Sequence, residues 1–519
     1  MVIFSLRLTS AAKSSLIEAV SRFFSALPAL LAWATIVAMF LFSWLTPDWV
    51  AIFIIFFDIY WLLKTIYLSF HLQHTFQKMR ANMKIDWLSR LKSLPPSSNY
   101  PHWEGVYHLV ILPFYKEPFS VIQESLNSLL AANYPSGRII VALGGEERVS
   151  EHARKVITFA ESAYGNKFFR FFTTLHPAAL PGELAGKGAN SAWIAHRVKE
   201  EIIDTLNLPY ENIITSVFDV DTQIPSEYFG ILTHAFLTNP DRLRASYQPI
   251  PFFTNNIFTA PALGRVVSFS ATFWQMMQQA RPERLTTFSS HAVPFQALVD
   301  IGFWETDLVS EDSRIFWQCF FRYNGWRVVP LNCPVYMDSS VAPTFWRTMK
   351  NIYLQQRRWG WGVENIPYML SGFVTNWRLR FSTKLYWSFI TLEGFHSWAT
   401  NALIIFALGW LPLLLGGADF NYSVLSYNLP EVTRFIMMLA MVGIASSAVV
   451  SVILLPPRPA WFRWYHYFLY LVQWLLMPLT LIIFGAIPGL EAQTRLALGG
   501  RFRLGFWVTP KYRSTSDSS

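Results

Sequence analysis

Long uncharged stretches lie near both ends of this chain of 519 residues. Phe23 to Pro47 carries no charge, and Trp49 to Phe70 carries only Asp58 and Lys64. Each stretch is long enough to cross a bilayer as a helix. A cleaved signal peptide would have a shorter apolar core and a small-residue cleavage site, so we predict two membrane anchors. Asp58 is a functional candidate inside the second anchor, although polar packing against a neighbouring helix explains it equally.

Uncharged stretches return late in the chain, at Phe395–Ala418, Phe435–Pro457 and Tyr465–Leu490. The composition agrees with a membrane protein, because 52% of the residues are hydrophobic and only 14% are charged. The net charge of +9 is spread over loops and both ends, as in a protein that faces anionic lipid. No dense run of Lys and Arg indicates a nucleic-acid partner. We therefore predict an integral membrane protein, in the cell membrane, that does not bind nucleic acid.

The charges also raise a question of sidedness. Two anchors return the chain to the side of its basic, cytosolic N-terminus, and three full spans after the central region would leave the C-terminal tail outside. The tail Glu491–Ser519 nevertheless has five Lys and Arg against two acids, which favours the cytosol. We therefore expect Tyr465–Leu490, which contains Pro478, to be broken or re-entrant, or the region Tyr386–Gly417 to cross twice.

The central region alternates between strand and helix patterns. Apolar, β-branched runs at Tyr107–Pro113, Arg138–Leu143, near Phe168–Thr174 and at Ile214–Thr222 predict strands, and Ser120–Ala132 predicts a helix. This alternation is typical of an α/β domain with parallel strands. The predicted division is an N-terminal tail with two transmembrane helices (1–72), a basic linker (73–104), the α/β domain (105–345), interfacial amphipathic helices (346–392), a C-terminal transmembrane region (393–490) and a basic tail (491–519).

Two carboxylates, Asp219 and Asp221, stand where the fourth predicted strand runs into a loop. Open α/β folds place ligands at the carboxyl ends of their parallel strands. There an Asp-x-Asp triplet can hold Mg²⁺ or Mn²⁺ while the diphosphate of a substrate fills the remaining coordination positions. The alternative is a solvated turn, which the same triplet often forms.

Further polar motifs surround this pair along the chain. Gly186-Lys187-Gly188-Ala189-Asn190 combines glycines that allow close backbone approach with a lysine that can reach a phosphate, but it lacks the spacing of a Walker loop. Ser310-Glu311-Asp312 and Gln355-Gln356-Arg357-Arg358-Trp359 follow, the latter on a predicted amphipathic helix at the membrane surface. Cys319 and Cys333 have no metal-ligand spacing and are predicted to be core thiols.

In this order the motifs resemble those of the membrane-embedded, inverting glycosyltransferases of family 2, the cellulose, chitin and hyaluronan synthase type. The matching segments are Pro113–Glu117, Gly186–Asn190, Asp219-Val220-Asp221, Ser310-Glu311-Asp312 in place of the family's Thr-Glu-Asp, and Gln355-x-x-Arg358-Trp359. The segment Phe506-x-Val508-Thr509-x-Lys511 looks like the gating loop of cellulose synthases. The resemblance implies a GT-A-like, Rossmann-related mixed sheet, inserted between transmembrane helices with its catalytic domain in the cytosol.

The resemblance also implies a role for each matched residue. Asp219 and Asp221 would position Mg²⁺ or Mn²⁺ against the diphosphate of a UDP- or GDP-sugar, with added positive charge from Lys187 and Arg358. Asp312 would be the general base, with Glu311 orienting the site. The remaining assignments are nucleotide-sugar binding for Tyr115, Glu117, Glu146 and Gln355, acceptor stacking for Trp359, and gating for Phe506, Val508, Thr509 and Lys511.

Taken singly, these residues also suit roles outside catalysis. Asp312 suits a helix N-terminus, Trp359 suits an interfacial aromatic belt, and Arg358 suits lipid phosphates. Lys511 has the appearance of a basic stop after a membrane segment. Glu146 replaces an acid of the family's Asp-Asp-Gly motif, so the nucleoside that it contacts, uridine or guanosine, stays open.

The motifs are compatible with three functions. The first is a processive polysaccharide synthase that moves its product across the membrane. The second is a glycosyltransferase that adds one sugar to a lipid acceptor, and the third is a non-catalytic membrane transporter. The intact acids Asp219, Asp221 and Asp312 favour an enzyme, and the Gln355–Trp359 motif with the Phe506–Lys511 segment favours a polymer.

Overall fold

The structure is a computed structural model that describes residues 10–95, 100–505 and 507–512, with side chains described from residue 20 onward. The chain divides into two compact units. One comprises Met1–Ile55, Gln356–Glu431 and Leu481–Gly505, and the other comprises Phe56–Gln355, Val432–Thr480 and Phe506–Ser519. Each unit is described by itself.

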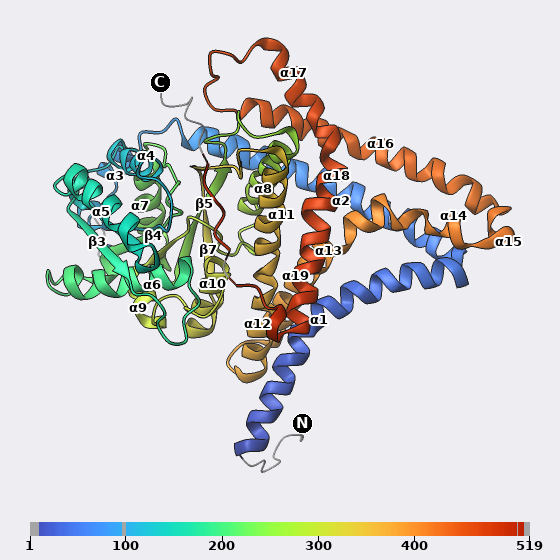
Figure 1. Ribbon diagram of the computed structural model, residues 1–519, viewed down its shortest axis with the longest axis horizontal. Coiled ribbons are helices and arrows are strands. Elements are labelled where there is room, and N and C mark those ends of the chain that lie inside the picture. The colour runs from blue at the N-terminus through green and yellow to red at the C-terminus, as the bar shows by residue number, and fades with distance from the viewer. Residues whose placement is uncertain (1–9, 96–99, 506, 513–519) are drawn as a thin grey trace. The chain divides into compact units, whose positions relative to one another are not determined.

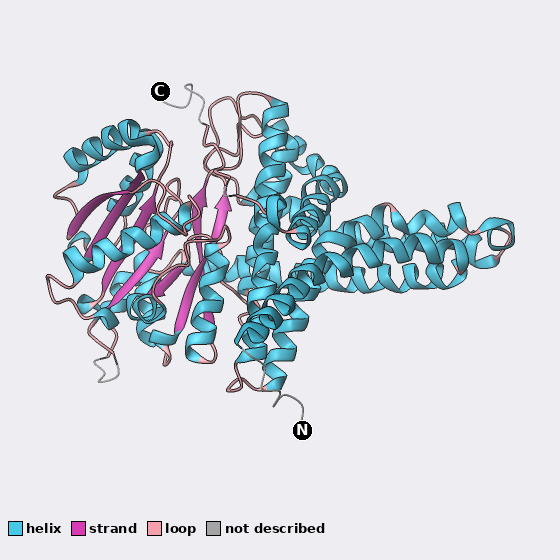
Figure 2. Cartoon of the chain, turned by 60° about the horizontal axis from the view of Figure 1, so that its bottom comes forward, coloured by secondary structure: helices cyan, strands magenta, loops and turns pink. Residues whose placement is uncertain are grey.

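The larger unit contains a single mixed sheet of seven strands (Figure 2). The strands are β1 (Tyr107–Pro113), β2 (Ile139–Glu146), β3 (Arg170–His176), β4 (Ile213–Val217), β5 (Ala245–Phe253), β6 (Ala292–Pro294) and β7 (Arg327–Met337). Their order is β3-β2-β1-β4-β6-β5-β7. Strands β1 to β4 are mutually parallel, β6 runs antiparallel to both its neighbours, and β5 pairs with β7 in parallel. The predicted fold class, a GT-A-like α/β domain inserted between apolar helices, is confirmed.

Helices cover both faces of this sheet (Figure 1). They are α3 (Trp87–Lys92), α4 (Phe119–Leu130), α5 (Ser150–Tyr164), α6 (Lys187–Val198), α7 (Tyr228–Thr238), α8 (Ala262–Gln279), α9 (Phe295–Ile301) and α10 (Glu311–Tyr323). Short 3₁₀ turns are η1 (Trp103–Gly105), η2 (Ser136–Arg138), η3 (Glu147–Val149), η5 (Tyr210–Asn212) and η6 (Arg242–Arg244), and the π turn η4 (Lys199–Ile203) extends α6.

Strand alternation sorts the core into two layers. Val110 and Leu112 of β1 and Val141 of β2 join one apolar cluster, which also takes in Ile122 of α4 and Val156 of α5. The intervening residues face α6, which packs against β1, β2 and β3. Both faces are therefore buried, which explains why these strands are continuous apolar runs in the sequence.

Apolar helices make up the rest of the chain. Among the residues that the structure describes, four helices are long and apolar enough to cross a membrane: Val20–Leu45 within α1 (Ser10–Leu45), α2 (Pro47–Asn82), α16 (Val424–Ile453) and the segment Trp464–Leu498. That last segment contains α17 (Trp464–Val472), η9 (Gln473–Leu476), α18 (Met477–Leu481), the π turn η10 (Ile482–Ala486) and α19 (Ile487–Leu498). The pair α13 (Phe381–Phe406) and Leu408–Leu415 is bent by 48° and is a fifth candidate, either a broken span or a re-entrant loop.

Within the smaller unit, α1 packs on α12 (Asn365–Thr375), α13 and α19. Trp33 donates to the Thr494 hydroxyl at 2.9 Å, and Arg357 pairs with Glu491 at 2.7 Å. The remaining elements are α11 (Phe345–Gly360), η7 (Trp361–Glu364), η8 (Leu408–Trp410), α14 (Leu411–Leu415), α15 (Gly417–Asn421) and η11 (Gly500–Phe502). The bend between α13 and η8 falls in Tyr386–Gly417, the region that is predicted to cross twice if Tyr465–Leu490 is not broken or re-entrant.

The two acids lie where the sequence predicts, because β4 ends at Val217 and Asp219 and Asp221 follow in the loop. The sheet departs from the sequence expectation at β5, β6 and β7, which the pattern does not predict, since β6 has only three residues and prolines interrupt β5 and β7. The expectation of parallel strands is correct for β1 to β4 and wrong for β6.

Gly144 offers a test of the packing between β2 and α6. A Cβ there would lie 2.3 Å from Ile194 Cδ1 and 2.8 Å from Asn190 Oδ1, whereas a Cβ at Gly137 would meet nothing within 4 Å. Overpacking of this kind costs about 1–3 kcal/mol. We expect Gly144→Ala to lower the thermal unfolding temperature in detergent and the matched Gly137→Ala to leave it unchanged. Equal unfolding temperatures for the two variants would contradict the close approach.

Candidate functional site

The loop after β4 places the two predicted metal ligands at the carboxyl end of the sheet. Phe218 N–H still donates to Ile111 O at 3.0 Å, which keeps the start of the loop registered on β1. Asp221 is fully buried, while Asp219 is partly exposed. A buried carboxylate at this edge requires compensating donors, and the surrounding segments supply them.

Lys187 joins two of the predicted acids. It begins α6, and its ammonium lies 2.7 Å from Asp219 Oδ1 and 3.1 Å from Asp312 Oδ1. Burial alone would lower the pKa of Lys187, but the carboxylates of Asp219, Asp312 and Glu311 outweigh it and hold the pKa above the ordinary lysine value. Lys187 is therefore charged, and acids that are far apart in the sequence converge on it.

Asp312 lies in the first turn of α10, where a negative charge is favourable. The alternative that it caps the helix is wrong, because the N-cap residue is Ser310. Next to it, Glu311 is buried against the start of α6, since a Cβ at Gly188 would lie 3.0 Å from Glu311 Cβ. The two motifs therefore pack directly on each other.

Asp221 is held by different donors. Its Oδ2 accepts the Asp338 N–H at 2.8 Å and the Lys511 ammonium at 2.6 Å. Its Oδ1 is buried and has no hydrogen-bond partner within the described part of the chain. Burial opposes the charge on Lys511, but Asp221, Asp338 and Asp219 raise the pKa of Lys511 above its ordinary value.

The Lys511 contact also bears on the C-terminal tail. Lys511 and Asp221 belong to the same unit, and their ion pair at 2.6 Å places Lys511 at this edge of the sheet. Thr509 is buried and Val508 is half-buried. Phe506 lies outside the described residues.

The predicted nucleoside-binding residues form a second group. The backbone N–H of Tyr115 donates to Glu117 Oε2 at 2.7 Å, which fixes the loop after β1. The Arg148 guanidinium lies over the Tyr115 ring at 4.8 Å and donates to Glu146 Oε2 at 3.2 Å. Glu146 is itself buried at the end of β2. Tyr115 and Glu146 are therefore connected through Arg148.

Three of the predicted residues are not brought to the acids by the described contacts. Gln355 is buried at the edge of the larger unit, whereas Arg358 and Trp359 belong to the smaller unit. Their predicted parts in binding the nucleotide sugar and the acceptor therefore stay predictions.

The sequence did not reveal three polar residues around the acids, Ser289, His291 and Asp338, nor His176 beside Glu146. Ser289 donates to Asp219 Oδ2 at 3.2 Å, and His291 Nδ1 lies 3.6 Å from Asp312 Oδ1. Burial lowers the pKa of His291, so the ring is neutral near pH 7. Asp338 follows β7, and His176 ends β3. A polar residue at the boundary of a strand could have indicated His176, His291 and Asp338. The boundary of β3 was predicted only approximately, and β6 and β7 were not predicted.

The donor set suits a hard cation that shares its coordination with a substrate. No group of three or more His, Cys, Asp or Glu side chains that could hold a metal occurs among the described residues. Mg²⁺ and Mn²⁺ do not need such a cage, because one or two carboxylates and substrate phosphates suffice. Asp221 Oδ1 is an oxygen ligand without a partner, and Asp219 lies two residues away. These two residues fit the ion, and two ammonium groups neutralise their charge in this structure.

Comparisons with known proteins point to sugar transfer. No protein-family model matches the chain. The chain is 22% identical over 397 residues to the poly-beta-1,6-N-acetyl-D-glucosamine synthase of Staphylococcus epidermidis, which covers 74% of this chain and 80% of that protein. The chain is thus similar in sequence to a polysaccharide synthase.

Solved structures with partial similarity are also glycosyltransferases by name. A mannosyltransferase from Pyrobaculum calidifontis in complex with GDP-Man and Mn²⁺ gives a TM-score of 0.36 at 13% identity, over 79% of this chain and 99% of that chain. S. aureus TarS in complex with UDP-GlcNAc gives a TM-score of 0.37 at 12% identity, over 77% of this chain and 93% of that chain. The fold class rests on the strand order and directions, not on these superpositions.

His176 provides a pH-dependent test of the nucleoside-side group. Its Nδ1 lies 3.4 Å from Glu146 Oε2 and its Nε2 lies 2.9 Å from Glu183 Oε2. Burial pulls the pKa of His176 down, but the two carboxylates raise it above 6.5 overall. The ion pairs of His176 therefore contribute fully to the free energy of unfolding below the unfolded-state pKa of about 6.5. This contribution is lost as the pH rises through the folded-state pKa.

We expect His176→Gln to cost about 1–3 kcal/mol at pH 6, because hydrogen bonds to charged groups are lost, and less at pH 9. Thermal unfolding in detergent across this range measures the difference. His102→Gln is the matched control, since His102 is exposed beside Glu104. A cost for His176→Gln that does not change with pH would rule out the charged imidazole.

Proposed function

We propose that this protein is a processive, inverting, metal-dependent glycosyltransferase that transfers sugar from a nucleotide donor to a growing polysaccharide. The convergence of Asp219 and Asp312 on the Lys187 ammonium carries the proposal. It brings a predicted metal ligand and a predicted base together at the carboxyl end of the sheet, where α/β enzymes bind their ligands. The sequence similarity to a polysaccharide synthase supports the same reaction class.

In the proposed reaction, Asp219 and Asp221 would hold Mg²⁺ or Mn²⁺, and this ion would stabilise the charge that builds on the departing diphosphate. Lys187 adds a fixed positive charge beside them. An acceptor hydroxyl attacks the anomeric carbon from the face opposite the diphosphate. As the new C–O bond forms, the bond to the diphosphate oxygen breaks, and Asp312 accepts the hydroxyl proton. Attack from the opposite face inverts the configuration.

The Lys187 contact has a consequence for Asp312. The ammonium lies 3.1 Å from Asp312 Oδ1 and holds this carboxylate at the edge of the sheet beside Asp219. His291 Nδ1 lies 3.6 Å from the same oxygen, and its ring is neutral because burial lowers its pKa. This position beside a predicted metal ligand supports Asp312 as the base and disfavours the non-catalytic transporter.

The nucleotide is assigned to the neighbouring group of residues. Tyr115 and Glu117 lie on the loop after β1, which neighbours β4 in the sheet order, and Glu146 ends β2, the next strand. We propose that Tyr115 and Glu146 contact the nucleoside, with UDP or GDP as the carrier.

Polymer formation and export are the finer part of the proposal. We assign acceptor stacking to Trp359 and gating to the tail around Lys511, and we place the α/β domain on the cytosolic side of the cell membrane. The apolar helices would carry the chain across. Addition of one sugar to a lipid is the second candidate, favoured by the exposed Phe345 and Trp346 at the start of α11, which suit contact with membrane lipid.

A panel of UDP- and GDP-sugars with Mg²⁺ or Mn²⁺ tests the proposal, with nucleotide release and then product size as readouts. We expect release with at least one donor and a product that lengthens with time. Asp312→Asn should reduce release about 10²–10⁴-fold, since it removes the base, while UDP binding is retained. Asp241→Asn, at an exposed turn, is the matched control. Full release by Asp312→Asn would refute the assigned base, and a product with a single added sugar would favour the lipid acceptor.

A further inference from the structure

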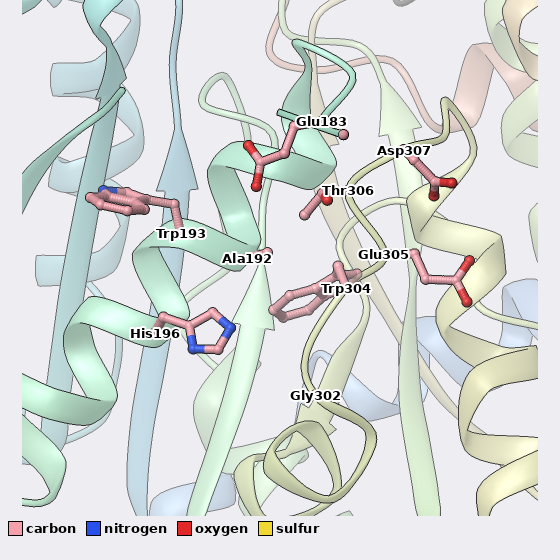
Figure 3. Close-up of a pocket in the computed structure, with 10 residues that line it drawn as sticks. Glu183, Ala192, Trp193, His196, Gly302, Trp304, Glu305, Thr306 and Asp307 are labelled. Carbon is pink, nitrogen blue, oxygen red and sulfur yellow. The ribbon is translucent and has the colours of Figure 1, made fainter. Parts of the chain in front are cut away.

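A pocket of about 410 Å³ without an assigned role lies in the larger unit, and its lining includes none of Asp219, Asp221 and Asp312 (Figure 3). Its walls come from α6 and from two loops, one before α6 and one before α10. Three acidic residues, Glu183, Glu305 and Asp307, line it together with His196, Trp193 and Trp304. None of these residues belongs to the sequence motifs assigned above.

The lining chemistry suits a sugar ring better than a phosphate. Glu305 pairs with Arg314 at 2.7 Å and Glu183 lies 2.9 Å from His176, while Asp307 adds a further carboxylate and the described lining contains no Lys or Arg. Negative charge repels a diphosphate. Indole faces and hydrogen-bonding groups are a suitable lining for a pyranose, which presents C–H groups on its faces and hydroxyls on its rim.

Figure 3 shows how these groups converge. The ring of Trp304 and the imidazole of His196 extend toward the same space, and the side chains of Glu183 and Thr306 lie above it in this view. The His196 side chain is exposed, and the Trp193 indole is fixed because its Nε1 donates to Thr174 Oγ1 at 3.0 Å. An aromatic surface is thus combined with a carboxylate, an imidazole and a hydroxyl.

The walls of the pocket are the segments that deliver the proposed catalytic groups. α6 begins with Lys187 and continues to Trp193 and His196, and the loop containing Trp304 leads into α10 and Asp312. Leu184 N–H donates to Thr306 O at 2.8 Å, which joins the two walls. A ligand bound between α6 and the loop before α10 would therefore contact and stabilise both segments.

The pocket is also connected to the nucleoside-side group. Glu183 contacts His176, and the other ring nitrogen of His176 faces Glu146. A ligand hydroxyl bound by Glu183 would therefore reach Glu146 through one buried imidazole.

We propose that this pocket is a binding subsite for one pyranose unit of the acceptor glycan, separate from the site of sugar transfer. The proposal rests on the proposed function for the identity of the ligand as a glycan. It assigns Trp193, His196 and Glu183 to binding, and it excludes the donor nucleotide from this pocket.

The test uses the full chain in lipid nanodiscs with a soluble β-1,6-linked N-acetylglucosamine oligosaccharide as the probe. Binding is measured by saturation-transfer NMR, and initial rates are measured against oligosaccharide and donor concentration. We expect His196→Ala and Trp193→Leu to raise the acceptor KM roughly three- to tenfold, the loss expected for one aromatic or polar contact. Donor KM and donor hydrolysis without acceptor should not change.

Matched variants separate binding from folding. Trp193→Phe keeps an aromatic face and should retain a near-wild-type acceptor KM, and His102→Ala removes an exposed imidazole elsewhere.

Unchanged acceptor KM in His196→Ala and Trp193→Leu, with active wild-type protein, would overturn the subsite and leave the proposed function intact. If the wild type releases no nucleotide from any donor, the proposed function fails, and oligosaccharide binding that is lost in His196→Ala would still support the subsite. If the wild type does not bind the oligosaccharide, the proposed subsite is overturned.

Discussion

The ammonium of Lys187 between Asp219 and Asp312 is the interaction on which the rest of the site depends. Carboxylates that share one ammonium repel each other, and the positive charge between them offsets this repulsion. The three residues come from the start of α6, the loop after β4 and the start of α10, so the whole parallel half of the sheet is needed to bring them together. The buried packing of Glu311 against Gly188 locks α10 to α6 and fixes this geometry.

A second ammonium, that of Lys511, neutralises Asp221 from the C-terminal tail. Three carboxylates thus face two ammonium groups in these ion pairs, and one oxygen of Asp221 has no partner within the described chain. This charge balance accommodates the positive charge of a divalent cation, which would in turn attract a diphosphate. It also gives the tail a structural reason to lie at the sheet, where sequence alone suggests either a gating segment or a basic stop.

Much of this arrangement could be predicted from sequence because buried parallel strands leave a strong pattern. β1 coincides with its predicted range, and the Asp219 pair, Lys187 and Asp312 stand at the ends of detectable elements. β6 could not be predicted, since three residues carry no periodicity. His291 and Asp338 were missed because their roles depend on β6 and β7, and the contact of Lys511 with Asp221 spans 290 residues, which no local pattern encodes. The pocket beside α6 was missed for the same reason, as its walls meet only in the folded chain.

The most direct test of the central claim is electron–nuclear double resonance of Mn²⁺ bound to the full chain together with UDP or GDP. If Asp219 and Asp221 hold the cation against the diphosphate, the wild type will show a ³¹P coupling that is lost or strongly reduced in Asp219→Asn and Asp221→Asn. The coupling should be retained in Asp241→Asn. An identical ³¹P coupling in the wild type and both site variants, or none in the wild type at saturating Mn²⁺ and nucleotide, would contradict the account.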